Sequence, residues 1–409
     1  MDERLLLELA ADLGYNLAMS GAETYRIEES IVRVLRTYGY EAEAFAIPNC
    51  LTISMITADG SPMTRMRRIG NHGNNLDAVE RYNNLSRKIC TQAPAPEVAL
   101  QWLKDTKENC LHFHHVGRGL GYFIGAFGYA IFYGGSVLDA IGAGFCGLII
   151  FLIDLWMDHV GANQFFRTIL AAFCCAAAAY AMHALGVLTY ADSSIIGALM
   201  LLVPGLLFTN AMRDIMYGDT NSGINRIVQV CLIAIAIALG TAGALNVAHT
   251  LWPDAVYPAA LPHSPLIQNL ASFIGSIGFA IYFNIHGPGG LLCAIGSVLS
   301  WSSYLVTVHF TKNVILGNLI GAMVASLYAE CMARIRKYPA ISYLVVSIFP
   351  LLPGAGVYYT MTYAVQGMVD EFANNGSLTA AIAGSIALGI ILISSAFRLV
   401  TARKRPKIK

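Results

Sequence analysis

The chain has 409 residues, of which 56% are hydrophobic and 12% are charged, and its formal net charge is +1. So much apolar surface with so little charge excludes a disordered chain, a disulfide scaffold and a general nucleic-acid binder. The charge is unevenly placed, because residues 1–117 hold 27 of the Asp, Glu, Lys and Arg residues and the rest of the chain holds 24. The sequence therefore predicts a charged head followed by a membrane-embedded body.

Residues 1–117 are expected to form a small cytoplasmic α/β domain. Apolar residues at helical spacing predict one helix through Leu5 and Leu17 and a second through Ile27 and Tyr38. The pattern then predicts strands over 42–47, 51–57 and 63–69, with a turn at 59–60, and helices over 75–90 and 96–108. The N-terminus has no apolar stretch that resembles a signal peptide, so we expect the head to stay in the cytoplasm.

The head carries a polar motif, Gly21-Ala-Glu-Thr-Tyr-Arg-Ile-Glu-Glu29, whose role stays open. Arg26 is a candidate for ligand binding, and a solvated helix face with charges is the alternative interpretation. The acidic members of the motif are Glu23, Glu28 and Glu29. Basic side chains on the third strand (Arg65, Arg67, Arg68) either contact an anion or form a basic strand edge.

No metal or cofactor is predicted. Three histidines (His112, His114, His115) precede the first apolar stretch, but no defined second pair completes a metal-type spacing. We interpret the nine cysteines as small core residues for the same reason.

From residue 120 onward the sequence predicts ten membrane spans, since about 20 apolar residues cross a bilayer core of about 30 Å. The spans are expected over 120–137, 139–157, 168–189, 193–212, 227–248, 266–283, 289–308, 313–332, 341–366 and 378–398.

Lys and Arg residues gather in the loops after even-numbered spans and in the C-terminal tail. Because cytoplasmic loops are enriched in these residues, both termini are assigned to the cytoplasm. The protein is thus expected to be a multi-pass protein of the plasma membrane, the inner membrane of a bacterium.

The body contains an internal repeat. Residues 123–133 match residues 273–283 with six identities in eleven positions, and Leu202-Val-Pro-Gly205 matches Leu351-Leu-Pro-Gly354 at nearly the same offset. Each unit then holds five spans, and an odd number reverses the direction of the second unit. The predicted fold is therefore two inverted five-helix repeats, an architecture of many secondary transporters.

The expected boundaries follow from the head and this repeat. They are a head over 1–117, a first repeat over 118–250, an external loop over 251–265, a second repeat over 266–400 and a basic cytoplasmic tail over 401–409.

Both copies of the repeat carry Pro-Gly near the middle of a span. Proline removes a backbone donor and glycine permits unusual dihedrals, so Pro204-Gly205 and Pro353-Gly354 should break or kink their helices. Freed backbone groups are tolerated in a bilayer only against protein or a wet cavity. We therefore predict that these four residues and Asn210 bind substrate, with a plain packing kink as the alternative.

Ionisable residues inside spans are costly and mark function. Asp154 is the first candidate for proton coupling, and Arg213 and Asp214 at the end of the fourth span are candidates for coupling or gating, with an interfacial ion pair as the alternative. Asp139 is expected to be solvated or to cap the second span. His183 is expected to be a satisfied core residue, and Glu330 to pair with Arg334 at i+4.

The chain resembles the threonine/serine exporter family over nearly its whole length. The resemblance rests on the head motif with Thr64-Arg65, on Phe132-Tyr-Gly-Gly-Ser136 with Asp139, and on 203–214 continuing to 218–219, Gly223 and Arg226. It implies proton-driven export of small hydrophilic metabolites, namely threonine and serine, or a dicarboxylate such as succinate in split two-subunit relatives. The family offers no assigned binding residues to carry over.

These observations favour a transporter over an enzyme. The leading function is a proton-coupled exporter of threonine and serine, and a dicarboxylate exporter is the first alternative. A metabolite-sensing receptor and an intramembrane hydrolase are the others, although the Gly-x-Gly-Asp pattern of an aspartyl protease is missing from the sequence. The expected partners are an amino or organic acid, protons and membrane lipid but no nucleic acid, and a homo-oligomer stays an option.

Overall fold

The structure is a computed structural model that describes residues 2–70, 73, 75–258, 260–336 and 338–403. Its contacts divide the chain into two compact units. The first unit comprises the residues up to Phe113 together with Phe283–His286, and the second comprises His114–Tyr282 and the chain from Gly287 onward. A short connection from the second half of the sequence thus belongs to the unit that the N-terminal region forms.

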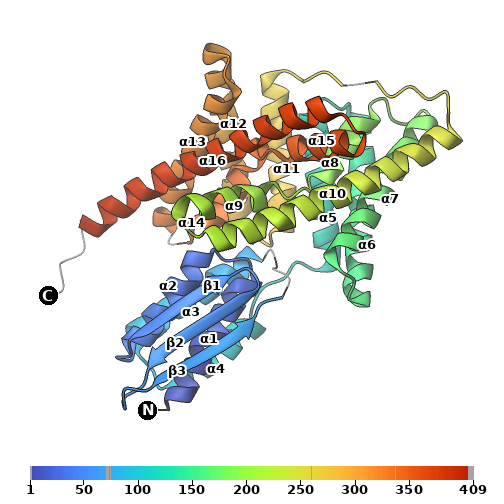
Figure 1. The fold of residues 1–409 in the computed structure, drawn as a ribbon. Coiled ribbons are helices and arrows are strands. Elements are labelled where there is room, and N and C mark those ends of the chain that lie inside the picture. The colour runs from blue at the N-terminus through green and yellow to red at the C-terminus, as the bar shows by residue number, and fades with distance from the viewer. Residues whose placement is uncertain (1, 71–72, 74, 259, 337, 404–409) are drawn as a thin grey trace. The chain divides into compact units, whose positions relative to one another are not determined.

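The first unit is built on a three-stranded antiparallel sheet in the order β1-β2-β3 (Figure 1). Its elements are β1 (Ala42–Ile47), β2 (Cys50–Ile56), β3 (Pro62–Arg68), α1 (Glu3–Met19), α2 (Thr24–Thr37), α3 (Leu76–Gln92) and α4 (Pro96–Glu108). All three predicted strands and all four predicted helices are present, each shifted by two residues or fewer where its limits were predicted.

Only one face of this sheet is covered. Alternate residues of β2 (Leu51, Ile53, Met55) are buried, because α1 packs against β2 and β3 while α2 packs against β1. On the opposite face Phe45 is 55% exposed and Met66 is 68% exposed. The strand sequence alternates with a period of two because one face of the sheet is covered by helices and the other is open.

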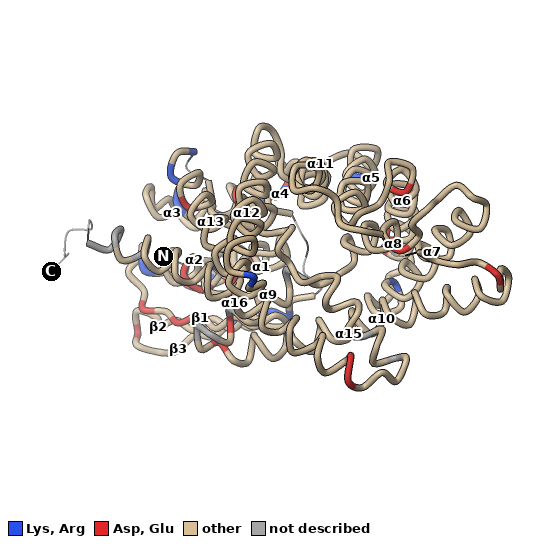
Figure 2. Tube along the Cα trace, turned by 90° about the horizontal axis from the view of Figure 1, so that it is seen from above, with Lys and Arg blue, Asp and Glu red and all other residues tan. Residues whose placement is uncertain are grey.

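The second unit is helical throughout its regular structure. Its elements are α5 (His115–Phe132), α6 (Val137–Val160), α7 (Gln164–Ala184), α8 (Ala191–Leu199), α9 (Gly205–Tyr217), α10 (Thr220–Leu251), α11 (Pro265–Tyr282), α12 (Gly289–Thr311), α13 (Val314–Arg336), α14 (Ala340–Ser347), the 3₁₀ turn η1 (Phe349–Leu351), α15 (Gly354–Val365) and α16 (Val369–Arg403). Figure 2 shows charged positions as isolated segments along these mostly tan helices.

Seven of these helices within the described residues are long and apolar enough to cross a membrane, or eight if the bent pair 340–364 counts as one span. The protein is therefore a polytopic helical membrane protein. The predicted spans over 120–137 and 193–212 fall on α5 and on the pair α8 and α9, which do not meet this criterion. His115 and Arg118 lower the hydropathy of α5, and α8 has only nine residues. Ten spans thus stay a prediction.

The two halves of this unit make the same set of helix contacts. In the first half α6 packs on α5, α7 and α8, and α10 packs on α7 and α9. In the second half α12 packs on α11, α13 and α14, and α16 packs on α13 and α15. The contacts between the halves are also reciprocal, because α9 meets α16 while α15 meets α10.

Helices α5 and α11 cross closely and run antiparallel. A Cβ atom placed on Gly128 would lie 2.3 Å from the backbone nitrogen of Gly275, and one placed on Gly278 would lie 2.2 Å from that of Gly125. Residue numbers therefore rise along α5 in the direction in which they fall along α11, so the two helices are antiparallel. Only glycine allows backbones to approach this closely, as small residues do at membrane helix interfaces.

Candidate functional site

The two Pro-Gly positions break their helices as the sequence predicts. Helix α8 ends at Leu199 and α9 begins at Gly205, while α14 and η1 end at Leu351 and α15 begins at Gly354. Pro204 (φ −82°, ψ 39°) and Pro353 (φ −77°, ψ 44°) hold the position before the new helix with nearly the same dihedrals. The duplicated sequence therefore forms the same backbone feature twice.

The two breaks lie against each other. A Cβ atom placed on Gly354 would lie 2.9 Å from Cγ1 of Val203 and 3.1 Å from Sδ of Met200. Val203 directly precedes Pro204, so the start of α15 touches the chain that leads into α9. The hydroxyl of Tyr133 also lies 3.5 Å from Sδ of Met200. Four of the five predicted binding residues, Pro204, Gly205, Pro353 and Gly354, thus belong to one region.

The first turns of α9 and α15 offer backbone amide donors at this region, except at Gly354, whose amide already donates to the carbonyl oxygen of Leu352 at 2.7 Å. A helix leaves its first N–H groups without intrahelical partners, and a proline side chain has no group that can accept from them. The same end of a helix carries the positive end of its dipole. Two helix starts therefore meet where a small anion would be favoured.

Helix α15 is held from the α16 side by one amide. The Nδ2 atom of Asn375 donates to the carbonyl oxygen of Gly356 at 2.8 Å and to Oγ1 of Thr360 at 2.8 Å. These bonds satisfy a carbonyl close to the break, which is the condition for irregular backbone inside a membrane.

Asp214, at the end of α9, does not face a free surface. Asp214 pairs with Arg226 of α10 at 2.9 Å, and their side chains are 8% and 13% exposed. The ion-pair interpretation therefore holds for Asp214, with a partner that the sequence analysis did not name. Asn210 is half-buried on the same helix. The side chain of Arg213 lies outside the described residues.

Asp154 sits in a different environment. Its Oδ2 atom accepts a hydrogen bond from the Tyr122 hydroxyl at 2.9 Å, and Tyr122 packs against Tyr282 with ring centroids 5.1 Å apart. Among the described residues, the contacts of Asp154 do not include a residue of either break. Its role in proton coupling stays a proposal.

Asp139 is a structural carboxylate. It is completely buried and accepts from the Ser136 amide at 2.8 Å and the Ser136 hydroxyl at 2.6 Å, and from the amides of Thr189 and Tyr190 at 2.8 and 3.0 Å. The expectation that it caps the second span is confirmed, and the alternative that it is solvated is wrong. It ties the turn after α5 to the segment before α8.

The head motif is less exposed than a solvated helix face would be. Glu23 and Arg26 form an ion pair at 3.2 Å with 8% and 17% exposure. Burial lowers the pKa of Arg26, but the Glu23 carboxylate and the Tyr25 phenol together raise it above its ordinary value. Glu28 accepts from the amide of Ala46 at 2.8 Å and so joins α2 to β1. Of the four motif residues only Glu29, paired with Arg33, is well exposed.

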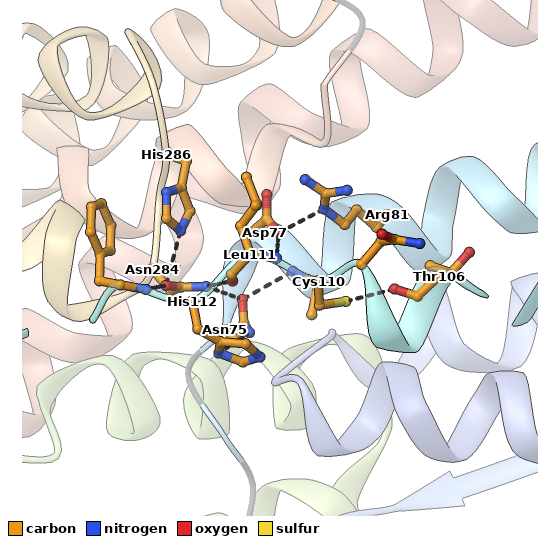
Figure 3. A network of polar contacts seen from close by, with 12 residues as sticks. Asn75, Asp77, Arg81, Thr106, Cys110, Leu111, His112, Asn284 and His286 are labelled. Atoms are coloured by element: carbon orange, nitrogen blue, oxygen red, sulfur yellow. Dashed lines mark hydrogen bonds and ion pairs between the residues drawn. The ribbon is translucent and has the colours of Figure 1, made fainter. Parts of the chain in front are cut away.

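The side chain of Asn284 makes several of the hydrogen bonds that join the connection 283–286 to the first unit (Figure 3). The side chain of Asn284 donates to Oδ1 of Asn75 at 2.7 Å and to the carbonyl of Leu111 at 2.6 Å, and accepts from the amide of Phe113 at 3.1 Å. Its φ of +59° is left-handed, a conformation that asparagine tolerates better than most residues. Asn284 therefore completes the N-cap region of α3, which Asn75 begins.

A histidine and a cysteine border this network. His286 stacks on Phe113 with ring centroids 4.0 Å apart and lies 3.1 Å from Oδ1 of Asn284, and burial lowers its pKa. The Cys110 thiol donates to the carbonyl of Thr106 at 3.2 Å, and burial raises its pKa. Within the described ranges, no group of three His, Cys, Asp or Glu residues is placed to hold a metal ion.

Comparison with known proteins identifies the family. The ThrE family, described as a threonine/serine exporter, matches residues 8–248, and its second form, described as "Threonine/Serine exporter, ThrE", matches residues 268–396. The "Threonine/serine exporter" of Corynebacterium glutamicum is 22% identical over 95% of this chain and 81% of its own length. No solved structure is a significant match.

Two longer relatives share the name "Pheromone-regulated membrane protein 10". The protein from Eremothecium gossypii is 24% identical over 92% of this chain, and the one from Kluyveromyces lactis is 21% identical over 92%. The matches span 52% and 41% of these two proteins, so each contains a large region outside the match. Family membership points to a transporter rather than an enzyme, and the chain belongs to the threonine/serine exporter family.

Proposed function

We propose that the protein exports threonine and serine across the plasma membrane in exchange for protons, with the substrate bound where the two Pro-Gly breaks meet. The observation that carries the proposal is the contact of Gly354 with Val203 and Met200, which brings two helix starts together inside a membrane unit. Membership of the exporter family supplies the transport reaction and the class of substrate.

The proposal includes ten spans in two inverted five-helix repeats, with both termini in the cytoplasm. Under the repeat match, Gly125 corresponds to Gly275 and Gly128 to Gly278. The close contacts join Gly125 to Gly278 and Gly128 to Gly275, the reciprocal pattern of a pseudo-two-fold axis. The equivalent helices α5 and α11 run antiparallel, which supports the inverted arrangement. The reciprocal contacts of α9 with α16 and of α15 with α10 support it at the breaks as well.

The site chemistry suits an amino acid. The first amides of α9 and α15 would bind the substrate carboxylate, as broken helices of other transporters do for anionic groups. Rocking of the two repeats around this region would then open it to each side in turn. Asp154, and Asp214 with Arg213, stay the proposed groups for proton coupling or gating, and Asn210 the proposed polar contact on α9.

Proteoliposomes loaded with labelled threonine test this function. An acidic exterior should speed threonine efflux, and a protonophore should abolish the increase, because inward proton movement would drive export. Pro204→Ala and Pro353→Ala should each lower efflux by about tenfold, since alanine permits a continuous helix where the site needs a broken one.

Pro265→Ala is the matched control, because Pro265 begins α11 away from the breaks and should leave efflux unchanged. Efflux of succinate in place of threonine and serine would favour the dicarboxylate alternative. Threonine efflux that changes neither with the proton gradient nor in the Pro204→Ala and Pro353→Ala variants would contradict the proposed coupling and the proposed site.

A further inference from the structure

A line of polar side chains joins α11 to α12, and neither the sequence analysis nor the proposed site uses it. The hydroxyl oxygens of Ser272 and Ser297 lie 2.6 Å apart, and the hydroxyl of Ser276 donates to that of Ser297 at 2.8 Å. These three side chains are completely buried. Nearer the start of α11, the Ser302 hydroxyl donates to Oδ1 of Asn269 at 2.9 Å. We call these five residues the polar ladder.

The polar ladder is long enough to cross half of a membrane core. Helix α11 begins at Pro265, so at a rise of about 1.5 Å per residue Asn269 lies about 6 Å and Ser276 about 16 Å along it. A bilayer core is about 30 Å thick. Asn269, Ser272 and Ser276 follow one another at spacings of three and four, which places them on one face of the helix. The polar ladder therefore runs from the start of α11, which is expected at the outer surface, toward the middle of the membrane.

Two further buried hydroxyl groups lie beside the inner part of the polar ladder. The hydroxyls of Tyr129 and Ser300 make no hydrogen bond among the described residues, and both side chains are completely buried. Ser300 follows Ser297 by three positions on α12, so the two share a face. A Cβ atom placed on Gly275, the residue before Ser276, would lie 2.7 Å from Cδ2 of Tyr129. Buried hydroxyls are normally paired, so these two are available for further hydrogen bonds.

The inner end of the polar ladder adjoins the second helix break. Tyr129 packs against Phe349 with ring centroids 5.6 Å apart. Phe349 begins η1, the turn that leads into Pro353. A group that passes along the polar ladder to Tyr129 thus arrives next to the proposed substrate site.

An aromatic ring separates this end from the carboxylate that is proposed for proton coupling. Phe279 packs against Tyr129 with ring centroids 5.4 Å apart, and against Tyr282 at 5.9 Å. Tyr282 in turn packs against Tyr122, whose hydroxyl donates to Asp154. A coupled transporter must not conduct protons freely across the membrane, and the apolar ring of Phe279 supplies a barrier between the two polar regions.

The polar ladder belongs to one repeat only. Under the repeat match, Ser272 and Ser276 correspond to Tyr122 and Ala126 on α5. The sequences of α5 and α6 contain no serine, threonine, asparagine or glutamine. A feature that only holds a helix pair together would be expected in both copies, whereas a route from one side of the membrane is needed once.

We propose that the polar ladder conducts protons from the outer surface to Tyr129, beside the second helix break. This inference rests on the proposed function and adds to it the route by which the driving proton enters. A hydroxyl accepts a proton at its oxygen and releases its own proton to the next acceptor, so a chain of hydroxyls passes a proton on and is left chemically unchanged. Ser297 is central to this route because it bonds to both Ser272 and Ser276.

Two transport assays on the full-length protein in proteoliposomes test the route. The first measures threonine efflux driven by an acidic exterior, and the second measures exchange of labelled for unlabelled threonine at equal pH, in which the loaded carrier returns without a proton. Ser297→Ala and Tyr129→Phe should each lower acid-driven efflux by about tenfold and leave exchange unchanged, because each removes one hydroxyl of the route. Phenylalanine is the equivalent residue at position 279, so the fold already accepts this ring at the crossing.

Ser326→Ala is the matched control, because Ser326 is also a buried serine but lies on α13, where it donates to the carbonyl oxygen of Ile390 at 3.5 Å. It should change neither assay. Equal losses in efflux and exchange for Ser297→Ala, with a lower unfolding temperature, would show that the polar ladder only holds the helices together. Acid-driven efflux that is unchanged in both folded variants would overturn this inference alone. Threonine efflux by the unaltered protein that ignores the proton gradient would overturn the proposed coupling as well.

Discussion

The two helix breaks share a backbone and differ in the charges that lie near them. After Pro204, helix α9 leads to Asp214, which is buried against Arg226 of α10. After Pro353, helix α15 has no charged residue and is held by neutral hydrogen bonds from Asn375 of α16 to Gly356 and Thr360. The dihedrals of the two prolines agree within a few degrees, so duplication preserved the conformation while the surrounding side chains diverged.

This difference separates a helix held by a buried ion pair from one held by neutral hydrogen bonds. A buried carboxylate with a cation in contact stabilises the fold only as long as both partners remain. The comparison therefore predicts a larger loss of stability at Asp214 than at Asn375.

The largest expected effect on stability follows removal of the buried ion pair. Asp214→Ala should lower the stability of the membrane unit by about 3–5 kcal/mol, because it leaves Arg226 buried without its partner. Asn375→Ala should lower it less, since it removes two neutral hydrogen bonds. Thermal unfolding in detergent measures both.

Replacing both members of the pair, with Asp214→Leu and Arg226→Met together, should recover much of the loss. Equal unfolding temperatures for Asp214→Ala and the unaltered protein would remove the distinction between the two helices that follow the breaks.

The turns that follow α5 and α11 give a second comparison between the halves. The first turn is closed by Asp139, which bonds to Ser136 and to two amides before α8. The second turn is closed by Asn284, whose partners Asn75 and Leu111 belong to the N-terminal part of the chain. Equivalent connections are thus secured by different parts of the molecule.

A smaller effect is expected when Asn284 is replaced by alanine. The variant should destabilise this network by about 1–3 kcal/mol, because it leaves the amide of Phe113 and the side chain of Asn75 with fewer partners. Hydrogen exchange of the full chain should then be faster at 111–113 and 283–286.

Asn284→Gly is the informative companion, since glycine adopts the left-handed conformation without strain but makes none of the side-chain bonds. If exchange in this glycine variant matches that of the unaltered protein, the backbone conformation rather than the hydrogen bonds holds the turn.

The sequence was most informative where a local pattern decides the structure. Period-two and helical spacing located the head strands and helices closely, and Pro-Gly located both breaks. The pairing of Glu330 with Arg334 is confirmed because it needs only helical spacing. Asp139 was correctly read as a cap because Ser136 precedes it at the capping-box distance.

These local patterns could not predict contacts between segments that are distant in the sequence. Arg226 lies twelve positions from Asp214 on the next helix, so no helical spacing links them. The sequence indicates only that Asn284 belongs to a glycine-rich turn, and its contact with Asn75 is seen only in the structure. His183 is satisfied at Nε2 only, which its sequence position could not indicate.

The most direct test of the central claim is substrate protection of a thiol at the meeting point of the breaks. In a Val203→Cys variant, a small methanethiosulfonate reagent labels the thiol, and mass spectrometry follows it against the exposed native Cys231. The account predicts that threonine slows labelling at position 203 without affecting Cys231, and that Pro353→Ala abolishes the protection. Labelling at position 203 that is indifferent to saturating threonine and serine, in protein that transports them, would contradict it.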